Sequence, residues 1–438
     1  MQKNTAGLDA GAAHVDSSKP SSPLPLLAAV TILTGIAAGL GGMLLALILH
    51  YLQHLAYSYS LDAIISPESF LEGVSATTPW RRFSVTLACG LVAGLGWWAL
   101  RRFGKPLVSI SAAVKSAEPR MPIGSTSAHA LLQIVTVALG SPLGREVAPR
   151  EIGAMLAGWM ARRAGLSVSE CQIMLACGAG AGLAAVYNVP LAGAAFVLEG
   201  LLLSFKWKAV IPALATSAIA AMVAWLGLGN ELQYSVPAFG VTASLIVWAV
   251  VAGPLFGYGA HLFVTVTNAA RKAAPRDASI IVLCLASFAL LGALAMFLPS
   301  LLGNGKGVAH LSFDTPVGIG MALLLLVLRV AMISAALRAG AQGGLLTPGL
   351  SCGALLGVAL GDAWCMLWPG VMPGAFAIVG ACAFLASSMR LPLTAILLVM
   401  EFTRVSHDFL LPMLLASAGS LTVFHYLQKR QLAAPARP

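Results

Sequence analysis

The sequence predicts an all-α, polytopic transmembrane protein whose two halves share one plan. Three observations lead to this prediction: a low share of charged residues, a series of apolar segments, and an internal repeat. Of the 438 residues, 58% are hydrophobic and 10% are charged. Soluble domains carry about 25% charged residues, so this chain cannot cover itself with a water-facing surface. A lipid bilayer is the solvent that fits its composition.

Apolar segments follow one another along almost the whole chain. Their lengths are unequal, and Gly and Pro interrupt many of them. A straight helix that spans the bilayer needs about 20 residues, and unequal, broken helices are typical of transporters with a binding site at mid-membrane. The expected apolar segments are 25–52, 83–100, 128–140, 146–161, 170–186, 190–205, 209–227, 241–268, 278–300, 316–337, 346–368, 374–388, 391–402 and 409–428.

An internal repeat relates the two halves. Residues 178–199 (GAGAGLAAVYNVPLAGAAFVLE) and 380–401 (GACAFLASSMRLPLTAILLVME) align without a gap and share nine of 22 residues. Upstream, at a nearly equal distance, GREVAPREIG at 144–153 matches GLLTPGLSCG at 344–353. The alternative is chance similarity between helices rich in Ala, Leu and Gly. Two ordered matches at a nearly constant spacing favour a duplicated plan.

The repeat and the composition together predict the domain organisation. The N-terminal tail is rich in Ser, Pro, Ala and Gly without an apolar period, so it is expected to be flexible and not a removed signal peptide. No regulatory domain is expected after the last apolar segment. The expected parts are a tail at 1–24, a first membrane repeat at 25–228, a loop at 229–240, a second membrane repeat at 241–428 and a short tail at 429–438.

The basic residues predict membrane topology and not nucleic-acid binding. Lys and Arg outnumber Asp and Glu by 26 to 16, but they form short clusters at the ends of apolar segments. Such clusters act as interfacial anchors and orient membrane proteins. We therefore expect a multi-pass protein of the inner (cytoplasmic) membrane, embedded in lipid and without a nucleic-acid partner. The clusters are Arg81 with Arg82, Arg101 with Arg102, Arg162 with Arg163, Lys206 with Lys208, Arg271 with Lys272, and Lys429 with Arg430.

Each half places a Gly-led, non-helical stretch directly before an apolar helix. The N-terminus of a helix exposes unpaired N–H groups and carries about half a positive charge. Two such ends that meet where the repeats face each other would bind an anion through backbone groups alone. Gly144 and Gly344 allow the backbone to approach a ligand closely.

Glu146 is the ionisable residue in the first of these turns, directly after Arg145. A carboxylate above a helix N-terminus occupies the place of an anion, and its protonation frees that place, so Glu146 is predicted to gate the site and to carry a proton. The alternative is a surface ion pair of Glu146 with Arg145 or Arg150. Glu199 and Glu401 end apolar helices, where a satisfied interfacial carboxylate is as good an interpretation as a functional one.

No metal, cofactor or enzymatic site is expected. His50 and His54 have the i, i+4 spacing of two metal ligands, but no acidic or Cys partner accompanies them. The seven scattered cysteines match neither a metal site nor a disulfide framework. The chain also lacks a GxxxxGK[ST] loop for ATP and any Ser/His/Asp or paired-carboxylate arrangement for hydrolysis.

Four motifs resemble those of the CLC family of chloride channels and chloride/proton exchangers. LGREVAPREIG at 143–153 is similar to the family's GREGP motif, and GGLLTPGL at 343–350 is similar to its GGIFAP or GGLFTP motif. YNVPLAGAAFVLE at 187–199 resembles the NAPLAG…E helix, and LPLTAILLVMEFT at 391–403 resembles the late PLTA…E-T helix. The motifs occur in the family's order, and the resemblance covers nearly the whole chain after the tail.

The resemblance implies a homodimer with one anion pathway per subunit, and subunits built from inverted repeats. By position, Glu146 would be the gating, proton-accepting glutamate and Glu199 an inner proton donor. The amides around Gly144 would line the outer anion sites, and those of Leu345 and Leu346 the central one. Leu346 is the repeat partner of Glu146, so the two helix ends face one site. The residues aligned with the anion sites are Gly104, Lys105, Gly144, Arg145, Glu146, Val147, Gly344, Leu345, Leu346 and Thr347.

One departure from the family concerns the early GSGIP motif, whose serine hydroxyl binds the central anion. Counting back from Pro119 aligns GKPLV at 104–108 with this motif, so Lys105 would replace the serine. A slip of the alignment would bring Ser109 or Ser111 into its place instead. A lysine in the pathway would attract or trap the anion, or it would turn away and cap the inner mouth.

Two further departures concern proton coupling and anion preference. Exchangers usually carry a Glu pair near the inner proton entry, where this chain has Glu199 and Gly200. The late tyrosine that donates its hydroxyl to the central anion has no counterpart, because Tyr426 comes too early. The leading hypothesis is transport of chloride or a similar monovalent anion, with Glu146 as gate and with proton exchange through Glu199 or water as inner donor. An uncoupled anion channel and a fluoride-handling variant are the alternatives.

Overall fold

The structure, a computed structural model, describes residues 22–59, 69–230 and 232–433. Within these ranges the regular elements are helices, and a single pair of bridged residues is the exception. Eight of the described helices are long and apolar enough to cross a membrane. The all-α transmembrane class is therefore confirmed, whereas the tail expected at 1–24 lies almost entirely outside the described residues.

The helices fall into two consecutive sets. The first set is α1 Leu24–Tyr57, α2 Phe70–Ala76, α3 Pro79–Phe103, α4 Ile110–Lys115, α5 Ile123–Ala138, α6 Val147–Arg163, α7 Val168–Tyr187, α8 Pro190–Ala195, the π-helical turn η1 Phe196–Leu201 and α9 Trp207–Leu228. The second set is α10 Ala243–Lys272, α11 Ser279–Ala295, the 3₁₀ turn η2 Pro299–Leu301, α12 Lys306–Asp314, α13 Ile319–Ala339, α14 Leu346–Cys365, α15 Pro373–Met389, α16 Pro392–Thr403, the 3₁₀ turn η3 His407–Phe409 and α17 Leu410–Ala433.

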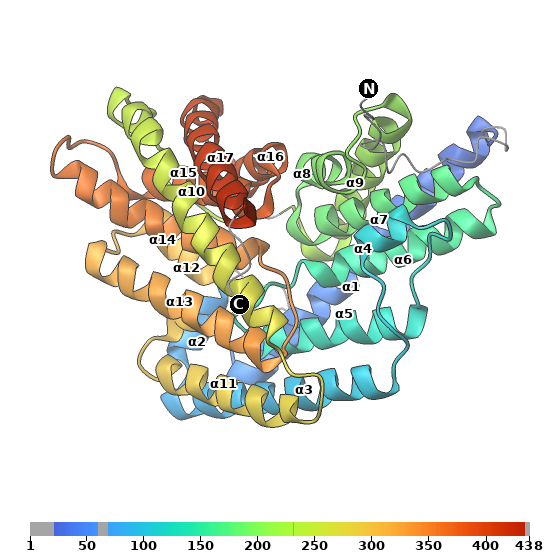
Figure 1. Cartoon of the computed structure of the whole chain (residues 1–438), viewed down its shortest axis with the longest axis horizontal. Helices are drawn as coiled ribbons and strands as arrows, with labels where there is room; N and C mark the ends of the chain where they lie inside the picture. Colours follow the sequence, from blue (N-terminus) through green and yellow to red (C-terminus); the bar gives the residue numbers. More distant parts are fainter. Residues whose placement is uncertain (1–21, 60–68, 231, 434–438) are drawn as a thin grey trace, which may run out of the picture.

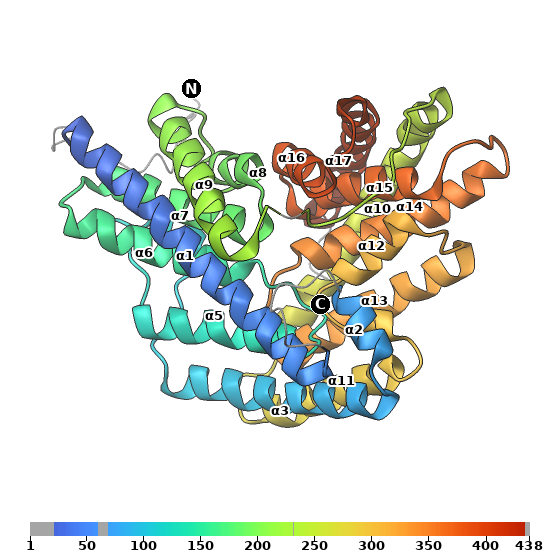
Figure 2. The same ribbon diagram turned by 180° about the vertical axis from the view of Figure 1, so that it is seen from behind.

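Corresponding helices make corresponding contacts in the two sets. α6 packs on α7 as α14 packs on α15, and α1 packs on α9 as α10 packs on α17. Figure 1 shows the two sets side by side, joined at one edge where α3 lies along α11. Seen from behind in Figure 2, the short helices α8 and α16 meet at the opposite edge. The starts of α6 and α14 lie in the interior between these two edges.

Glycines at matching repeat positions allow the inner helices to touch. On the α6–α7 contact, a Cβ at Gly153 would overlap the carbonyl of Gly178, and one at Gly178 would overlap the carbonyl of Gly153. On the α14–α15 contact, a Cβ at Gly353 would lie 2.7 Å from the carbonyl oxygen of Gly380. Small residues at helix crossings let backbones approach closely in membranes, where packing replaces the hydrophobic drive.

Some helix ends differ from those expected from the apolar segments. α1 has 34 residues and a length of about 51 Å, which exceeds the thickness of the hydrocarbon core. α17 continues to Ala433, past the expected start of the tail at 429. It continues because no Pro or Gly interrupts it there, and because Lys429 and Arg430 reach water by extending their side chains.

Candidate functional site

The Gly-led stretches of the two halves pair with each other at the centre of the molecule. Gly144 N donates to Gly344 O at 2.8 Å, and Gly344 N donates to Gly144 O at 2.9 Å. This reciprocal bridge lies three residues before Val147, where α6 starts, and two residues before Leu346, where α14 starts. The positive ends of two buried helices are thereby held next to each other.

The side chain of Glu146 lies between the two helix N-termini, over the glycine bridge. Glu146 is fully buried, and its Oε1 accepts a hydrogen bond of 2.7 Å from the backbone N of Leu346. Its carboxylate lies directly over both glycines of the bridge, since a Cβ at Gly144 or at Gly344 would overlap a carboxylate oxygen. Oε2 has no hydrogen-bond partner among the described residues. The carboxylate of one repeat therefore occupies the helix N-terminus of the other.

The two neighbouring arginines do not form the surface ion pair that was the alternative for Glu146. The Arg145 side chain is 6% exposed, and its guanidinium lies over the Tyr187 ring, 5.4 Å from the centroid. Arg150 donates from Nε to the backbone O of Glu146 at 2.9 Å, and its guanidinium lies over the Phe196 ring. In the part of the chain that the structure describes, the Glu146 carboxylate forms no ion pair within 4 Å.

A cavity of about 760 Å³ reaches Arg145, the residue next to Glu146, from one side, and we call it the vestibule. Its lining is rich in basic groups, which raise the local concentration of anions. Arg145 belongs to this lining, so the vestibule ends at the residue next to Glu146. Val137, one residue before the end of α5, also borders it. The Lys, Arg and His residues of the lining are His50, His54, Arg145, Lys306, His310 and Arg404.

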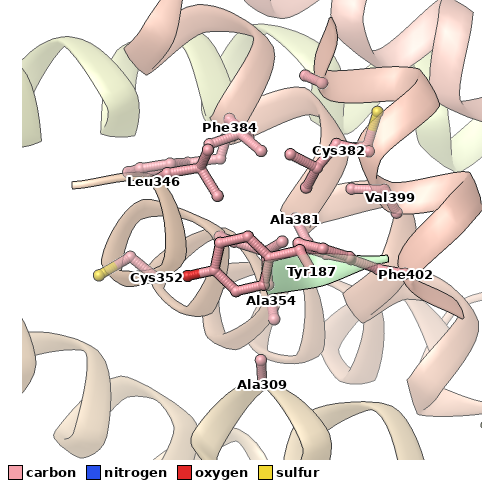
Figure 3. Packing of buried hydrophobic residues seen from close by; sticks show 14 of the residues in the cluster. Tyr187, Ala309, Leu346, Cys352, Ala354, Ala381, Cys382, Phe384, Val399 and Phe402 are labelled. Atoms are coloured by element: carbon pink, nitrogen blue, oxygen red, sulfur yellow. The ribbon is translucent and has the colours of Figure 1, made fainter. Parts of the chain in front are cut away.

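A buried hydroxyl pair flanks the start of α14. The Tyr187 hydroxyl lies 3.1 Å from Thr347 Oγ1, in the first turn of α14 and directly after Leu346. Figure 3 shows the Tyr187 ring packed among apolar residues, with its hydroxyl pointing away from Phe402. The sequence contains this tyrosine in the motif YNVP, but the resemblance to the family directs attention to a tyrosine in the late part of the chain, so Tyr187 was missed. Tyr426, the late candidate, is 62% exposed on α17.

The loop after α3 holds the other residues predicted to bind the anion. Gly104 ends α3 with its N–H on the Leu100 carbonyl at 2.9 Å, and Lys105 is exposed. Ser109 caps α4 by accepting from the backbone N of Ala112 at 3.2 Å. Its hydroxyl therefore already has a structural partner, while the place of Lys105 in the anion pathway stays a prediction.

Glu199 and Glu401 each cap the start of a helix in the other half of the molecule. Glu199 accepts from Leu393 N at 2.9 Å and from Thr394 N at 2.7 Å at the start of α16, and Thr394 Oγ1 adds a third bond at 2.6 Å. Glu401 accepts from Leu191 N at 3.0 Å and from Ala192 N at 2.8 Å at the start of α8. These contacts favour the structural interpretation of both carboxylates.

No metal centre is formed by the described residues, which contain no group of three or more His, Cys, Asp or Glu side chains in reach of one ion. All seven cysteines are free thiols. His50 and His54 belong to the vestibule lining instead. The groups gathered at the start of α14 are the Leu346 amide, the Glu146 carboxylate and the hydroxyls of Tyr187 and Thr347.

Fold and site together define a multi-pass membrane protein with a backbone-lined candidate anion site between two related halves. The family model described as voltage gated chloride channel matches residues 87–425. A putative chloride channel protein, ClcB-like, of Ralstonia nicotianae is 31% identical over 365 residues, which cover 79% of this chain and 83% of the relative. The H(+)/Cl(-) exchange transporter ClcA of Cronobacter sakazakii is 27% identical over 438 residues, which cover 95% of this chain and 90% of the relative.

A solved structure with a similar fold is that of a slow cyanobacterial Cl-/H+ antiporter. Its TM-score is 0.77 at 21% sequence identity, and the match covers 95% of this chain and 100% of that chain. The chain belongs to the CLC family of voltage gated chloride channels. The family and the CLC-type inverted-repeat fold that the motifs predicted are thus confirmed.

Proposed function

We propose that this protein transports chloride or a similar monovalent anion across the membrane through the site between α6 and α14. The observation that carries the proposal is the Glu146 carboxylate on the Leu346 amide. A buried helix N-terminus that binds a carboxylate oxygen also suits a halide ion, because both are anions that accept N–H groups. Transport through this site makes the protein a carrier or channel and not an enzyme.

Glu146 is the gate of this pathway. Its ionised carboxylate competes with the anion for the Leu346 amide, and a protonated side chain loses most of that advantage because its charge is gone. The unpartnered Oε2 is the atom at which a proton binds without breaking the contact of Oε1. Once protonated and displaced, Glu146 opens the way from the vestibule and carries its proton along.

Hydroxyl groups provide further hydrogen-bond donors to the anion, in addition to the backbone amides. Tyr187 and Thr347 share one hydrogen bond of 3.1 Å beside the Leu346 amide, and either hydroxyl has a hydrogen to offer an anion. This geometry supports Tyr187 as the hydroxyl donor that the late part of the sequence lacks. The remaining predicted contacts, from Gly104 and Lys105 at the opposite mouth, belong to the same proposal.

Proton counter-transport is the coupled form of this function. Glu146 supplies the outer proton acceptor, and Glu199 or a water path supplies the inner donor. The absence of a carboxylate at Gly200 favours an uncoupled channel, which is the second candidate. A fluoride-handling variant fits the departures at the serine and tyrosine positions.

The family and the charges support a proposal for the assembly and the location. The protein is proposed to form a homodimer with one pathway in each subunit. It lies in the lipid of the inner membrane, with its basic clusters at the ends of the membrane helices acting as anchors.

Chloride efflux from liposomes, recorded together with external pH, tests the proposal. Glu146→Gln mimics the protonated gate, so its flux is expected to lose the pH dependence that the unmodified protein shows. Glu118→Gln is the matched control, because Glu118 is an exposed carboxylate in the loop between α4 and α5, paired with Arg120 at 3.1 Å. Flux that keeps its full pH response in Glu146→Gln would refute the gating role. No flux of chloride or of fluoride would refute the transport function.

A further inference from the structure

A second buried titratable group lies near the gate, and the mechanism above does not use it. His129 on α5 contacts Glu151 on α6, with Nδ1 2.6 Å from Oε2 and with 7% and 11% of the two side chains exposed. His129 Nε2 lies 2.9 Å from Gln342 Oε1, in the loop before α14. We call these three residues, with Gln133 and Trp97 that flank the imidazole, the His129 cluster.

The contact between His129 and Glu151 holds one exchangeable proton. A ring nitrogen and a carboxylate oxygen at 2.6 Å need a hydrogen between them, because two lone pairs would otherwise repel. The pair is neutral as a whole whether that proton is on the imidazole or on the carboxyl. Loss of the proton leaves one negative charge, and gain of a second leaves one positive charge. Either state is costly in a buried site, so the pair tends to pass a proton on and not to keep it.

A polar stripe on α5 connects this pair with the face of the protein opposite the vestibule. Thr126, His129 and Gln133 lie on one side of the helix by their spacing of three and four residues. The stripe begins beside the end of α3, where a Cβ at Gly104 would lie 3.3 Å from Ser125 Oγ. The vestibule borders the other end of α5, at Val137.

Buried polar atoms along this stripe lack protein partners. Thr126 Oγ1, Trp97 Nε1 and Gln133 Oε1 have no hydrogen bond to any described residue. Buried polar atoms of this kind are normally satisfied by internal water. One hydroxyl, one N–H donor and one acceptor around a histidine provide the complementary contacts that hold such water molecules in a row.

The other side of the cluster reaches the gate. Glu151 is five residues after Glu146 on α6, a rise of about 7.5 Å along the helix. Gln342 precedes Gly344, the glycine of the central bridge, by two residues. The pair therefore lies within about one and a half helical turns of the gate, and the relay requires one or two water molecules to carry a proton from it to the Glu146 carboxylate.

Of the titratable groups on the helices around His129, Glu151 is the one that hydrogen-bonds to the imidazole. α5 packs on α1, α3 and α6. The Arg150 guanidinium lies over the Phe196 ring and interacts electrostatically with Glu146 and Glu151. Cys89 donates to Thr136 O at 3.2 Å, two turns further along α5. The other titratable or charged groups of these elements, among the described residues, are His50, Tyr51, His54 and Tyr57 on α1, Arg81, Arg82, Arg101 and Arg102 on α3, and Arg145, Glu146, Arg162 and Arg163 at the ends of α6.

We propose that His129 and Glu151 relay protons between the face opposite the vestibule and Glu146, in place of the carboxylate that is absent at Gly200. A proton arriving along the α5 stripe adds to the pair, which then holds two. The pair passes one proton through water to the Glu146 carboxylate and returns to its one-proton state. The protonated Glu146 releases the Leu346 amide to an anion. This relay rests on the proposed proton-coupled transport.

The test compares proton and chloride fluxes of the full-length protein in liposomes with an imposed chloride gradient. Glu151→Gln keeps the size of the side chain and a hydrogen bond to His129 but cannot take up a proton. We expect the ratio of proton to chloride flux to fall by about tenfold or more, since a positioned acid–base group contributes 10²–10⁴-fold to a proton transfer. Chloride flux itself is expected to continue, and Glu151→Asp is expected to restore part of the ratio.

Matched controls separate a relay from a structural role. Glu170→Gln changes a carboxylate that bonds Ser22 and Ser167 at the start of α7, away from the α5 stripe, and is expected to keep the ratio of the unmodified protein. If Glu151→Gln does not fold, His129→Gln is measured for the same ratio. An unmodified protein that conducts chloride without moving protons refutes the coupled function and the relay together. Coupling that survives unchanged in Glu151→Gln or His129→Gln refutes the relay alone.

Discussion

Replacing Glu199 with alanine removes a carboxylate that holds the start of α16 from the other half of the chain. Three donors lose their acceptor: the backbone N–H groups of Leu393 and Thr394 and the Thr394 hydroxyl. A hydrogen bond to a charged group is worth about 1.5–3 kcal/mol, and loss of a helix cap costs about 0.5–2 kcal/mol. Leu393 is partly exposed, so water replaces part of the loss. We therefore expect Glu199→Ala to lower the free energy of unfolding by about 2–3 kcal/mol.

Related variants give an order of stability that the contacts predict. Glu199→Gln retains one acceptor oxygen and is expected to lose about half as much. Glu401→Ala removes an acceptor with two donors, Leu191 N and Ala192 N, and is expected to lie between the other two variants. The midpoint of thermal unfolding in detergent, followed by the fluorescence of the nine tryptophans, measures this order.

A Glu199→Ala protein that unfolds at the same temperature as the unmodified protein would refute the capping role. The ratio of proton to chloride flux, measured on the same samples, separates capping from proton donation. A loss of coupling in Glu199→Ala but not in Glu401→Ala would show that Glu199 also donates protons. Equal ratios of proton to chloride flux in both variants would show that Glu199 acts as a helix cap and not as a proton donor.

Two further variants test the anion site and the helix packing. Tyr187→Phe removes a hydroxyl beside the Leu346 amide. We expect chloride affinity, measured by calorimetric titration, to fall about tenfold, because one hydrogen bond to a charged group is lost. A larger loss of affinity in Thr347→Val than in Tyr187→Phe would assign the contact to threonine instead. Gly178→Ala places a methyl group against the Gly153 carbonyl and is expected to cost at least about 1–3 kcal/mol of stability. Gly124→Ala, where a Cβ has no atom within 4 Å, is the control, and an equally small effect of both changes would contradict the packing argument.

The repeat alignment was informative about the site because it concerned backbone. It paired Glu146 with Leu346, and in the structure the carboxylate of one contacts the amide of the other. Helix ends and glycines leave a pattern in the sequence, since their conformational requirements are local. The residue roles that depend on the resemblance alone, such as that of Lys105, stay predictions.

Contacts between side chains of different helices could not be predicted in the same way. His129 and Glu151 are 22 residues apart and meet because α5 packs on α6, which no local pattern specifies. The available indication was that an ionisable residue within an apolar segment points to function. The short helix α2 was also missed, although Ser69 and Glu72 form a capping box that the sequence contains.

The reciprocal bridge of Gly144 and Gly344 has a consequence for how ions pass. A cycle in which the halves rock apart would break two buried backbone hydrogen bonds, and each buried group left unpaired costs about 1–3 kcal/mol. Rotation of the Glu146 side chain breaks one hydrogen bond, which a proton or an arriving anion compensates. On the proposed function, we therefore expect access to the site to alternate by this side-chain rotation, which is the smaller of the two motions. We expect spectroscopic distance labels on the two halves to report no movement between them during chloride transport.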